Sequence, residues 1–274
     1  MDFEAFEAYL MGKYCLAVAK DRLSYAKKFS DCLVNRDFSE LRLMTPDKRV
    51  HVMKALAALS KFLGIYEDFR SLVKNYGFKW KGKSSDQLII ERLTKVQNPD
   101  EVFEWTKTVK RELPELECFM DFMTVTGLRF IEAINSYNLI IELTKEGKLS
   151  SYYDSQKAVL THYKFKDIFI RNSKKAFISF VSKRLVEAIG RRQPLNYSSV
   201  QTIVRRKIRK QRFSDIREAH GTFLTKHLRQ PEIDFIHGRV SANVFMQSYF
   251  NPALISDLKD RLSKGVSELL NKVS

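Results

Sequence analysis

The sequence has no run of 18 or more apolar residues, so it predicts no segment that crosses a membrane. Its first ten residues, MDFEAFEAYL, are acidic where a secretory signal peptide is basic, which argues against secretion. Only three cysteines are present (Cys15, Cys32 and Cys118), and none forms a CxxC pair. We therefore expect reduced, mostly buried thiols in an intracellular protein.

Common signatures of metal and nucleotide chemistry are also missing. The sequence contains no HExxH pair, no clustered set of Asp, Glu and His ligands and no GxxxxGK[ST] phosphate loop. We therefore expect neither a metal nor a cofactor. The chain has no low-complexity segment, and its 44% apolar and 29% charged residues are typical of a globular protein rather than a disordered one.

Acidic residues are in deficit, because 48 Lys and Arg face only 32 Asp and Glu and leave a net charge of +16. Such a surplus favours a polyanionic partner, most commonly nucleic acid, because bound phosphates release condensed counterions. A solubility charge spread evenly over the surface would give the same total. The placement of the cations must therefore decide between the two.

The spacing of apolar residues predicts four helices within residues 1–78. One of them has a start signal at Thr45–Pro46 and a stop signal at Gly64. The polar, basic stretch 79–88 is predicted to be a linker. Three of its lysines suit the join of a two-lobed clamp on DNA: Lys79, Lys81 and Lys83.

The second predicted domain, residues 89–274, is mainly helical with one small antiparallel sheet. Ile168 and Ile170 alternate before a turn at Asn172–Ser173, and the pattern resumes from Phe177 to Val181, which predicts a β-hairpin. A terminal helix over 252–274 has an apolar face. This face would pack on its own core or on a neighbouring copy of the chain.

Two segments place an arginine where a phosphate could bind. TGLRFIEA, residues 126–133, is a turn into a helix that begins at Arg129, beside free backbone N–H groups. An ordinary surface arginine is the alternative. Arg217 enters a buried helix, where its charge needs a partner, either a phosphate or a structural carboxylate such as Glu132.

The third segment contains His237 and Arg239, and Tyr249 follows ten residues after Arg239. A tyrosine between apolar residues is usually part of the core. It becomes a nucleophile only where several cationic donors stabilise the phenolate and the phosphorane together.

In this order, the three segments resemble the boxes of the tyrosine recombinase (phage integrase) family. The resemblance covers nearly the whole chain, since the N-terminal helices look like the family's core-binding domain and the rest like its catalytic domain. It assigns the catalytic roles to five residues: Arg129, Lys174, Arg217, Arg239 and Tyr249. Lys175 is a second candidate for the hairpin lysine. Arginine at position 239 resembles the integrases of archaeal viruses and plasmids, the fuselloviral type.

One departure from the family affects proton handling. Ser214 stands where the family usually has a histidine, and serine is no base near neutral pH. His220 and His237 lie nearby in sequence as possible substitutes. The alternative is that both are packed, hydrogen-bonded histidines.

The resemblance implies transesterification of DNA without metal or ATP. Arg129 and Arg217 would hold the scissile phosphate, with Arg239 as a third donor. Tyr249 would attack to give a 3′-phosphotyrosyl bond, and Lys174 would protonate the leaving 5′ oxygen.

A basic stretch upstream of Arg217 is predicted to lie along phosphates or in a major groove. Its cations are Arg205, Arg206, Lys207, Arg209, Lys210 and Arg212. A solvated basic face is the alternative for this stretch.

We expect double-stranded DNA as the partner, a homo-oligomer on DNA with a tetrameric synapse, and a place in the cytoplasm, associated with the nucleoid, of an archaeal host cell. Two other functions stay open. A type IB topoisomerase would use the same tyrosine and arginines to relax DNA, and a catalytically idle DNA-binding relic would have lost activity with the change at Ser214.

Overall fold

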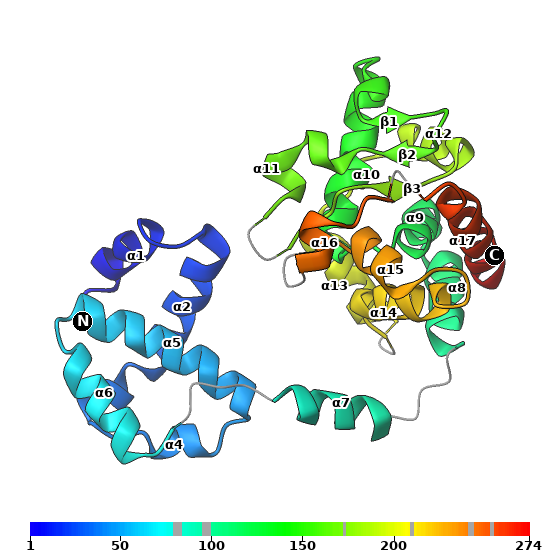
Figure 1. Cartoon of the computed structure of the whole chain (residues 1–274). Helices are drawn as coiled ribbons and strands as arrows, with labels where there is room; N and C mark the ends of the chain where they lie inside the picture. Colours follow the sequence, from blue (N-terminus) through cyan, green and yellow to red (C-terminus); the bar gives the residue numbers. More distant parts are fainter. Residues whose placement is uncertain (79–83, 95–99, 172–173, 209–210, 241–243, 253–254) are drawn as a thin grey trace. The chain divides into compact units, whose positions relative to one another are not determined.

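The computed structural model describes residues 1–78, 84–94, 100–171, 174–208, 211–240, 244–252 and 255–274 (Figure 1). The chain divides into two compact units, residues 1–96 and 97–274. Helices dominate both units, and the second also has a three-stranded antiparallel sheet, which confirms the predicted mainly α class with a small sheet. Among the helices described, none is long and apolar enough to cross a membrane.

The first unit is a helical bundle around the long helix α5. Its helices are α1 (Phe3–Met11), α2 (Leu16–Phe29), α3 (Asp31–Val34), α4 (Ser39–Arg42), α5 (Pro46–Phe62), α6 (Tyr66–Asn75) and α7 (Ser85–Thr94). The four longest before residue 78 correspond to the four predicted helices. Pro46 is the first residue of α5, as predicted, because its missing N–H costs nothing there. Phe6, Met53 and Leu56 are fully buried in the core between α1, α2 and α5.

The predicted linker coincides only in part with described structure. Residues 79–83, with Lys79, Lys81 and Lys83, lie outside the described residues. Helix α7 begins at Ser85, within the stretch 79–88 that was predicted to be a linker, and belongs to the first compact unit.

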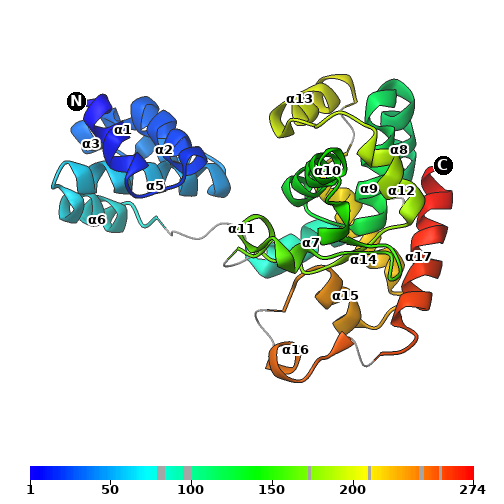
Figure 2. The ribbon, with the colours of Figure 1, turned by 90° about the horizontal axis from the view of Figure 1, so that it is seen from above.

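The second unit surrounds one buried helix, α9. Its helices are α8 (Glu101–Glu112), η1 (Pro114–Leu116), α9 (Glu117–Thr126), α10 (Phe130–Lys145), η2 (Leu149–Ser151), η3 (His162–Lys164), α11 (Lys166–Phe169), α12 (Lys183–Gly190), α13 (Tyr197–Lys207), α14 (Phe213–Leu224), α15 (Gln230–Ile236), α16 (Val244–Ser248) and α17 (Leu258–Val273). Every residue of α9 except Glu117 and Asp121 is buried, because α8, α10, α12, α14 and α17 all pack against it (Figures 1 and 2). Tyr137 of α10 meets the ring of Phe119 edge-on at 5.5 Å.

The sheet consists of β1 (Tyr153–Asp154), β2 (Val159–Leu160) and β3 (Ser179–Phe180), in that order. Neighbouring strands are antiparallel, with Tyr153 opposite Leu160 and Leu160 opposite Ser179. The sequence pattern identified the segment of β3 but not the hairpin formed by β1 and β2.

The prediction of a first strand for the β-hairpin, around Ile168 and Ile170, is wrong. Residues 166–169 form the single helical turn α11, and the N–H of Ile170 donates to the carbonyl of Lys166 at 2.8 Å. This turn buries Phe169 completely, with its ring 4.6 Å from that of His162. A strand would have turned Phe169 away from Ile168 and Ile170, so burial of Phe169 prevails over the alternating pattern. Between the two sides only the bridge of Ile170 with Lys175 is formed in the described part.

The terminal helix α17 is shorter than the predicted helix 252–274, and it packs on its own unit. Leu262, Leu269 and Val273 are at most 2% exposed, in one cluster with residues of α14 and α15. An ion pair adds to this packing, because Nη1 and Nη2 of Arg261 donate to the buried carboxylate of Glu232 in α15, at 2.8 and 2.6 Å. The apolar face is therefore occupied within the chain in this structure, and docking on a neighbouring copy stays a prediction.

Candidate active site

A left-handed turn between α9 and α10 places Arg129. Gly127 ends α9 with φ of +56°, and a Cβ atom there would lie 2.4 Å from Nδ1 of His220. Both the backbone angle and the close approach require glycine. The chain then enters α10 at Arg129, whose N–H donates to Glu132 in the first turn of that helix at 3.3 Å. The predicted turn into a helix is confirmed.

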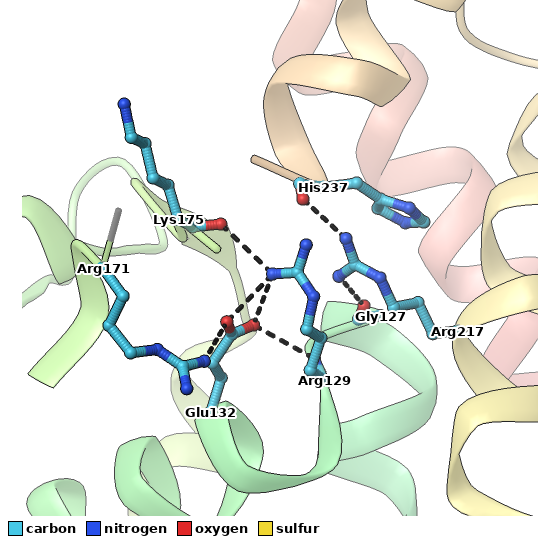
Figure 3. A network of polar contacts seen from close by, with 7 residues as sticks. All are labelled: Gly127, Arg129, Glu132, Arg171, Lys175, Arg217 and His237. Atoms are coloured by element: carbon cyan, nitrogen blue, oxygen red, sulfur yellow. Dashed lines mark hydrogen bonds and ion pairs between the residues drawn. The ribbon is translucent and has the colours of Figure 1, made fainter. Parts of the chain in front are cut away.

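Glu132 is a buried carboxylate between two arginines (Figure 3). Its side chain is 1% exposed, and its Oε1 accepts from Nη1 of Arg129 and from Nη2 of Arg171, both at 2.9 Å. Arg129 thus keeps a fixed guanidinium with a quarter of its side chain open to solvent. Arg171 was not predicted from the sequence; the available signal was Glu132, an acid that needs more than one partner once buried.

Arg217 of α14 is held by two backbone carbonyls instead of the carboxylate of Glu132. Its Nη1 donates to the carbonyl of Gly127 at 2.6 Å and its Nη2 to that of His237 at 2.5 Å (Figure 3). Burial, together with the nearby charges of Arg129 and Arg239, lowers the pKa of Arg217 to about 10. Arg217 therefore stays protonated at neutral pH, although Arg129 and Arg239 both disfavour its charge.

Arg239 follows a second obligatory glycine. Gly238 has φ of +64°, and a Cβ there would lie 1.7 Å from the carbonyl oxygen of Lys175. This close approach packs the end of α15 against the lysine hairpin. The guanidinium of Arg239 is about half exposed, and its Nη1 lies 3.7 Å from Oδ1 of Asp234.

Aromatic stacking joins the segments that carry Arg129 and Arg217. Phe130, the residue after Arg129, stacks face to face on Phe213 at the start of α14, with ring centroids 4.1 Å apart and an interplanar angle of 1°. Ser214 is exposed one helical turn before Arg217, and its hydroxyl donates to Asp215 at 3.2 Å.

His220 and His237 form a buried pair behind Arg217. Their rings stack at 5.1 Å, with Nδ1 of His220 2.9 Å from Nε2 of His237, and Nε2 of His220 lies 3.3 Å from the carbonyl of Val125. Burial lowers the pKa of His220 to about 4 and holds the pKa of His237 well below its usual range. Both are neutral, packed histidines, the alternative considered from the sequence, and they position Arg217 through the carbonyl of His237.

Three buried histidines make stability depend on pH. Burial also lowers the pKa of His162 to about 3. In the folded chain His162, His220 and His237 therefore stay unprotonated, whereas in the unfolded chain they bind protons below about pH 6.5. We expect the free energy of unfolding to fall from pH 6.5 to pH 5 by up to about 1.4 kcal/mol per pH unit for each histidine. Urea denaturation at several pH values measures this slope.

Matched variants separate these histidines from the remaining groups. His162→Gln should reduce the slope by the share of one proton, whereas Asn35→Gln, at an exposed side chain without an ionisable group, should leave it unchanged. A free energy of unfolding that is constant between pH 5 and 6.5 would contradict the predicted proton uptake.

The backbone carbonyls of Lys174 and Lys175 contact arginines, whereas no contact of their side chains with an arginine is described. The carbonyl of Lys175 is 3.5 Å from Nη1 of Arg129, while the side chain of Lys175 points away from Arg129 (Figure 3). Lys174 is exposed, and its carbonyl accepts from the N–H of Arg171 at 3.0 Å. The predicted turn residues, Asn172 and Ser173, lie outside the described residues.

Tyr249 is an exposed residue, and in the described part of the chain its side chain has no hydrogen bond to Arg129, Arg217 or Arg239. It follows α16, is 74% exposed, and its N–H donates to the carbonyl of Phe245 at 2.9 Å. Its hydroxyl has no hydrogen-bond partner within the described part of the chain. The structure thus brings Arg129, Arg217, Arg239 and the lysine hairpin together and leaves Tyr249 at the surface.

The basic stretch lies at the end of α13 and the start of α14. Arg205, Arg206 and Lys207 are exposed in the last turn of α13, and Arg212 is paired with Asp215 at 3.3 Å. Arg209 and Lys210 lie outside the described residues. In the residues that are described, no three His, Cys, Asp or Glu side chains gather to form a metal site.

Comparison with known proteins identified a family. The model of a family described as archaeal phage integrase matches residues 94–261, more than half of the chain and nearly all of the second unit. The matched region includes every arginine, lysine, histidine and tyrosine of the candidate site. No curated protein and no solved structure matches the chain.

Proposed function

Because the chain belongs to the archaeal phage integrase family, we propose that it is a site-specific DNA recombinase that cuts and rejoins DNA through a 3′-phosphotyrosyl intermediate. One observation carries this proposal: Arg217 donates to the carbonyls of Gly127 and His237 and so lies beside the segments of Arg129 and Arg239. In the described residues these three arginines have two carboxylate partners, Glu132 and Asp234. Such an excess of fixed positive charge needs an anion, and a DNA phosphate supplies it.

The arginines suit the transition state of phosphoryl transfer. Gly127 and His237 hold Arg217 in place through their carbonyls, and Glu132 holds Arg129, so neither guanidinium has to reorganise when the phosphate binds. Preorganised donors of this kind stabilise the added charge of a pentacoordinate phosphorus more than the ground state. Non-bridging oxygens of the scissile phosphate would accept from the remaining N–H groups.

The covalent step keeps the free energy of the broken phosphodiester bond in the new bond between phosphorus and tyrosine. Tyr249 gives its phenolic proton to water, which reaches the exposed side chain, and its oxygen forms a bond to phosphorus. The bond from phosphorus to the 5′ oxygen breaks, and Lys174 gives that oxygen a proton. Rejoining is the reverse attack by a 5′ hydroxyl, so no ATP is needed. The exposed position of Tyr249 is compatible with attack within its own chain or in a neighbouring copy of the expected tetramer.

A denaturing assay on supercoiled DNA with two candidate attachment sites tests the proposal. We expect a protein–DNA adduct that survives denaturation and a recombinant product. An adduct with relaxed but unrecombined DNA would favour the type IB topoisomerase. DNA binding with no adduct at any site or temperature tested would leave the idle relic.

DNA binding by α13 is tested through its salt dependence. Lys207 is exposed in the last turn of α13, and we expect Lys207→Ala to weaken binding across DNA sequences and to flatten the slope of log K against log salt by about one unit. Lys145→Ala is the matched control, since Lys145 ends α10 at about 24 Å from Arg129, given 1.5 Å per helical residue. An unchanged slope in Lys207→Ala would show that α13 does not face DNA.

A further inference from the structure

The described backbone of the lysine hairpin, residues 169–171 and 174–176, is joined by one bridge and meets Arg129 and Gly238 through the carbonyl of Lys175. Across its turn, the N–H of Arg171 donates to the carbonyl of Lys174 at 3.0 Å, and the N–H of Ala176 donates to that of Phe169 at 3.0 Å. Ile170 and Lys175 pair as an isolated bridge, and among the described residues from 166 to 178 none belongs to the three-stranded sheet. A general acid on such a segment needs an additional anchor to stay near the scissile phosphate.

Arg171 provides that anchor. Its Nη2 donates to Oε1 of Glu132 at 2.9 Å, the same oxygen that accepts from Nη1 of Arg129 (Figure 3). Glu132 holds both arginines in fixed positions, because its side chain is 1% exposed and lies in the first turn of α10. One buried carboxylate therefore fixes the distance between an arginine of the phosphate site and the residue whose backbone holds Lys174.

We propose that Arg171 is a positioning residue that holds Lys174 in reach of the leaving 5′ oxygen by tying the hairpin to Glu132. The inference rests on the proposed function, in which Lys174 is the proton donor. It goes beyond that function by making proton donation depend on a side chain that touches neither the phosphate nor the leaving group.

The other role open to Arg171 is direct binding of DNA, since 42% of its side chain is exposed. The two roles differ in which step they affect. A residue that acts through Lys174 affects only departure of the 5′ oxygen, whereas a phosphate contact affects binding and attack on any substrate. A substrate whose leaving group needs no proton separates them.

The test compares single-turnover cleavage of two DNA substrates, one ordinary and one with sulfur in place of the bridging 5′ oxygen. In both, the oxygen of Tyr249 bonds to phosphorus; in the second, the bond from phosphorus to sulfur breaks and a thiolate leaves without a proton. We expect Arg171→Ala to cleave the ordinary substrate at least roughly tenfold more slowly than the wild type, and the sulfur substrate within about threefold of it.

Three further variants complete the design. Lys174→Ala should show the same selective rescue by sulfur. Arg171→Lys, which keeps the charge but not the planar fork, should be partly active on the ordinary substrate. Lys166→Ala removes a charge from the adjoining turn α11 at an exposed side chain and should behave as the wild type on both substrates.

An Arg171→Ala defect of equal size on both substrates, or no defect on the ordinary one, would overturn the proposal. Rescue by sulfur also shows that the variant is folded, because the same protein cleaves the second substrate at nearly the wild-type rate. Failure of the proposed function is distinguishable, since the wild type itself would then form no adduct with either DNA.

Discussion

Tyr249→Phe is expected to abolish the covalent protein–DNA adduct completely while leaving DNA affinity and its salt dependence unchanged. The substitution removes one oxygen atom, the nucleophile of the proposed reaction, and nothing replaces it. The side chain is 74% exposed and its hydroxyl has no partner in the described residues, so the folded state loses no hydrogen bond. Denaturing electrophoresis of labelled DNA measures the adduct, and a binding titration measures the affinity.

A second surface tyrosine gives the matched control for this variant. Tyr163 is 46% exposed, and Tyr163→Phe should form as much adduct as the wild type. An adduct that persists in Tyr249→Phe would assign the nucleophile to another residue, and a loss in both variants would point to a general effect of removing a surface hydroxyl.

Arg217→Lys is expected to slow cleavage by roughly 100- to 1,000-fold, the loss found when a donor to the charge of a transition state is removed. Lysine keeps the charge, but an ammonium group has no planar fork that reaches the carbonyls of Gly127 and His237 and a phosphate oxygen together. The buried carbonyls that lose their donor should also lower the free energy of unfolding by about 1–3 kcal/mol. Single-turnover cleavage and urea denaturation measure the two effects.

Arg184→Lys tests whether the effect belongs to the site. Arg184 is exposed near the start of α12, and its replacement should change neither the cleavage rate nor stability. Cleavage by Arg217→Lys within threefold of the wild type would remove Arg217 from the proposed phosphate site.

Local signals in the sequence were sufficient for the long helices α1, α2, α5 and α6 and for the turn into α10. Pro46 opens α5, because its missing N–H has no partner to lose at the first position of a helix. Gly127 gives the turn that leads into α10, because its positive φ suits glycine. The resemblance to the integrase family implied one site for Arg129, Arg217 and Arg239. In the structure Arg217 donates to the carbonyls of Gly127 and His237, two residues before Arg129 and Arg239 in turn.

Contacts between distant segments could not be predicted from those signals. Alternating apolar residues around Phe169 indicated a strand, but burial of its ring against His162 favours one helical turn. The role of Arg171 depends on its meeting Glu132, 39 residues earlier in the chain. The backbone carbonyls that bind Arg217 could not be identified from residue types, since every residue has a carbonyl.

Gly238 has a consequence for how this lineage can evolve. Any Cβ at this position would collide with the carbonyl of Lys175, 1.7 Å away, in a backbone conformation that side chains rarely adopt. The side chains at positions 214 and 239 are exposed and meet no such steric limit, but no replacement is neutral at 238. In remote relatives whose catalytic boxes have diverged, a glycine just after the end of this helix should therefore outlast the neighbouring side chains as a marker of common descent.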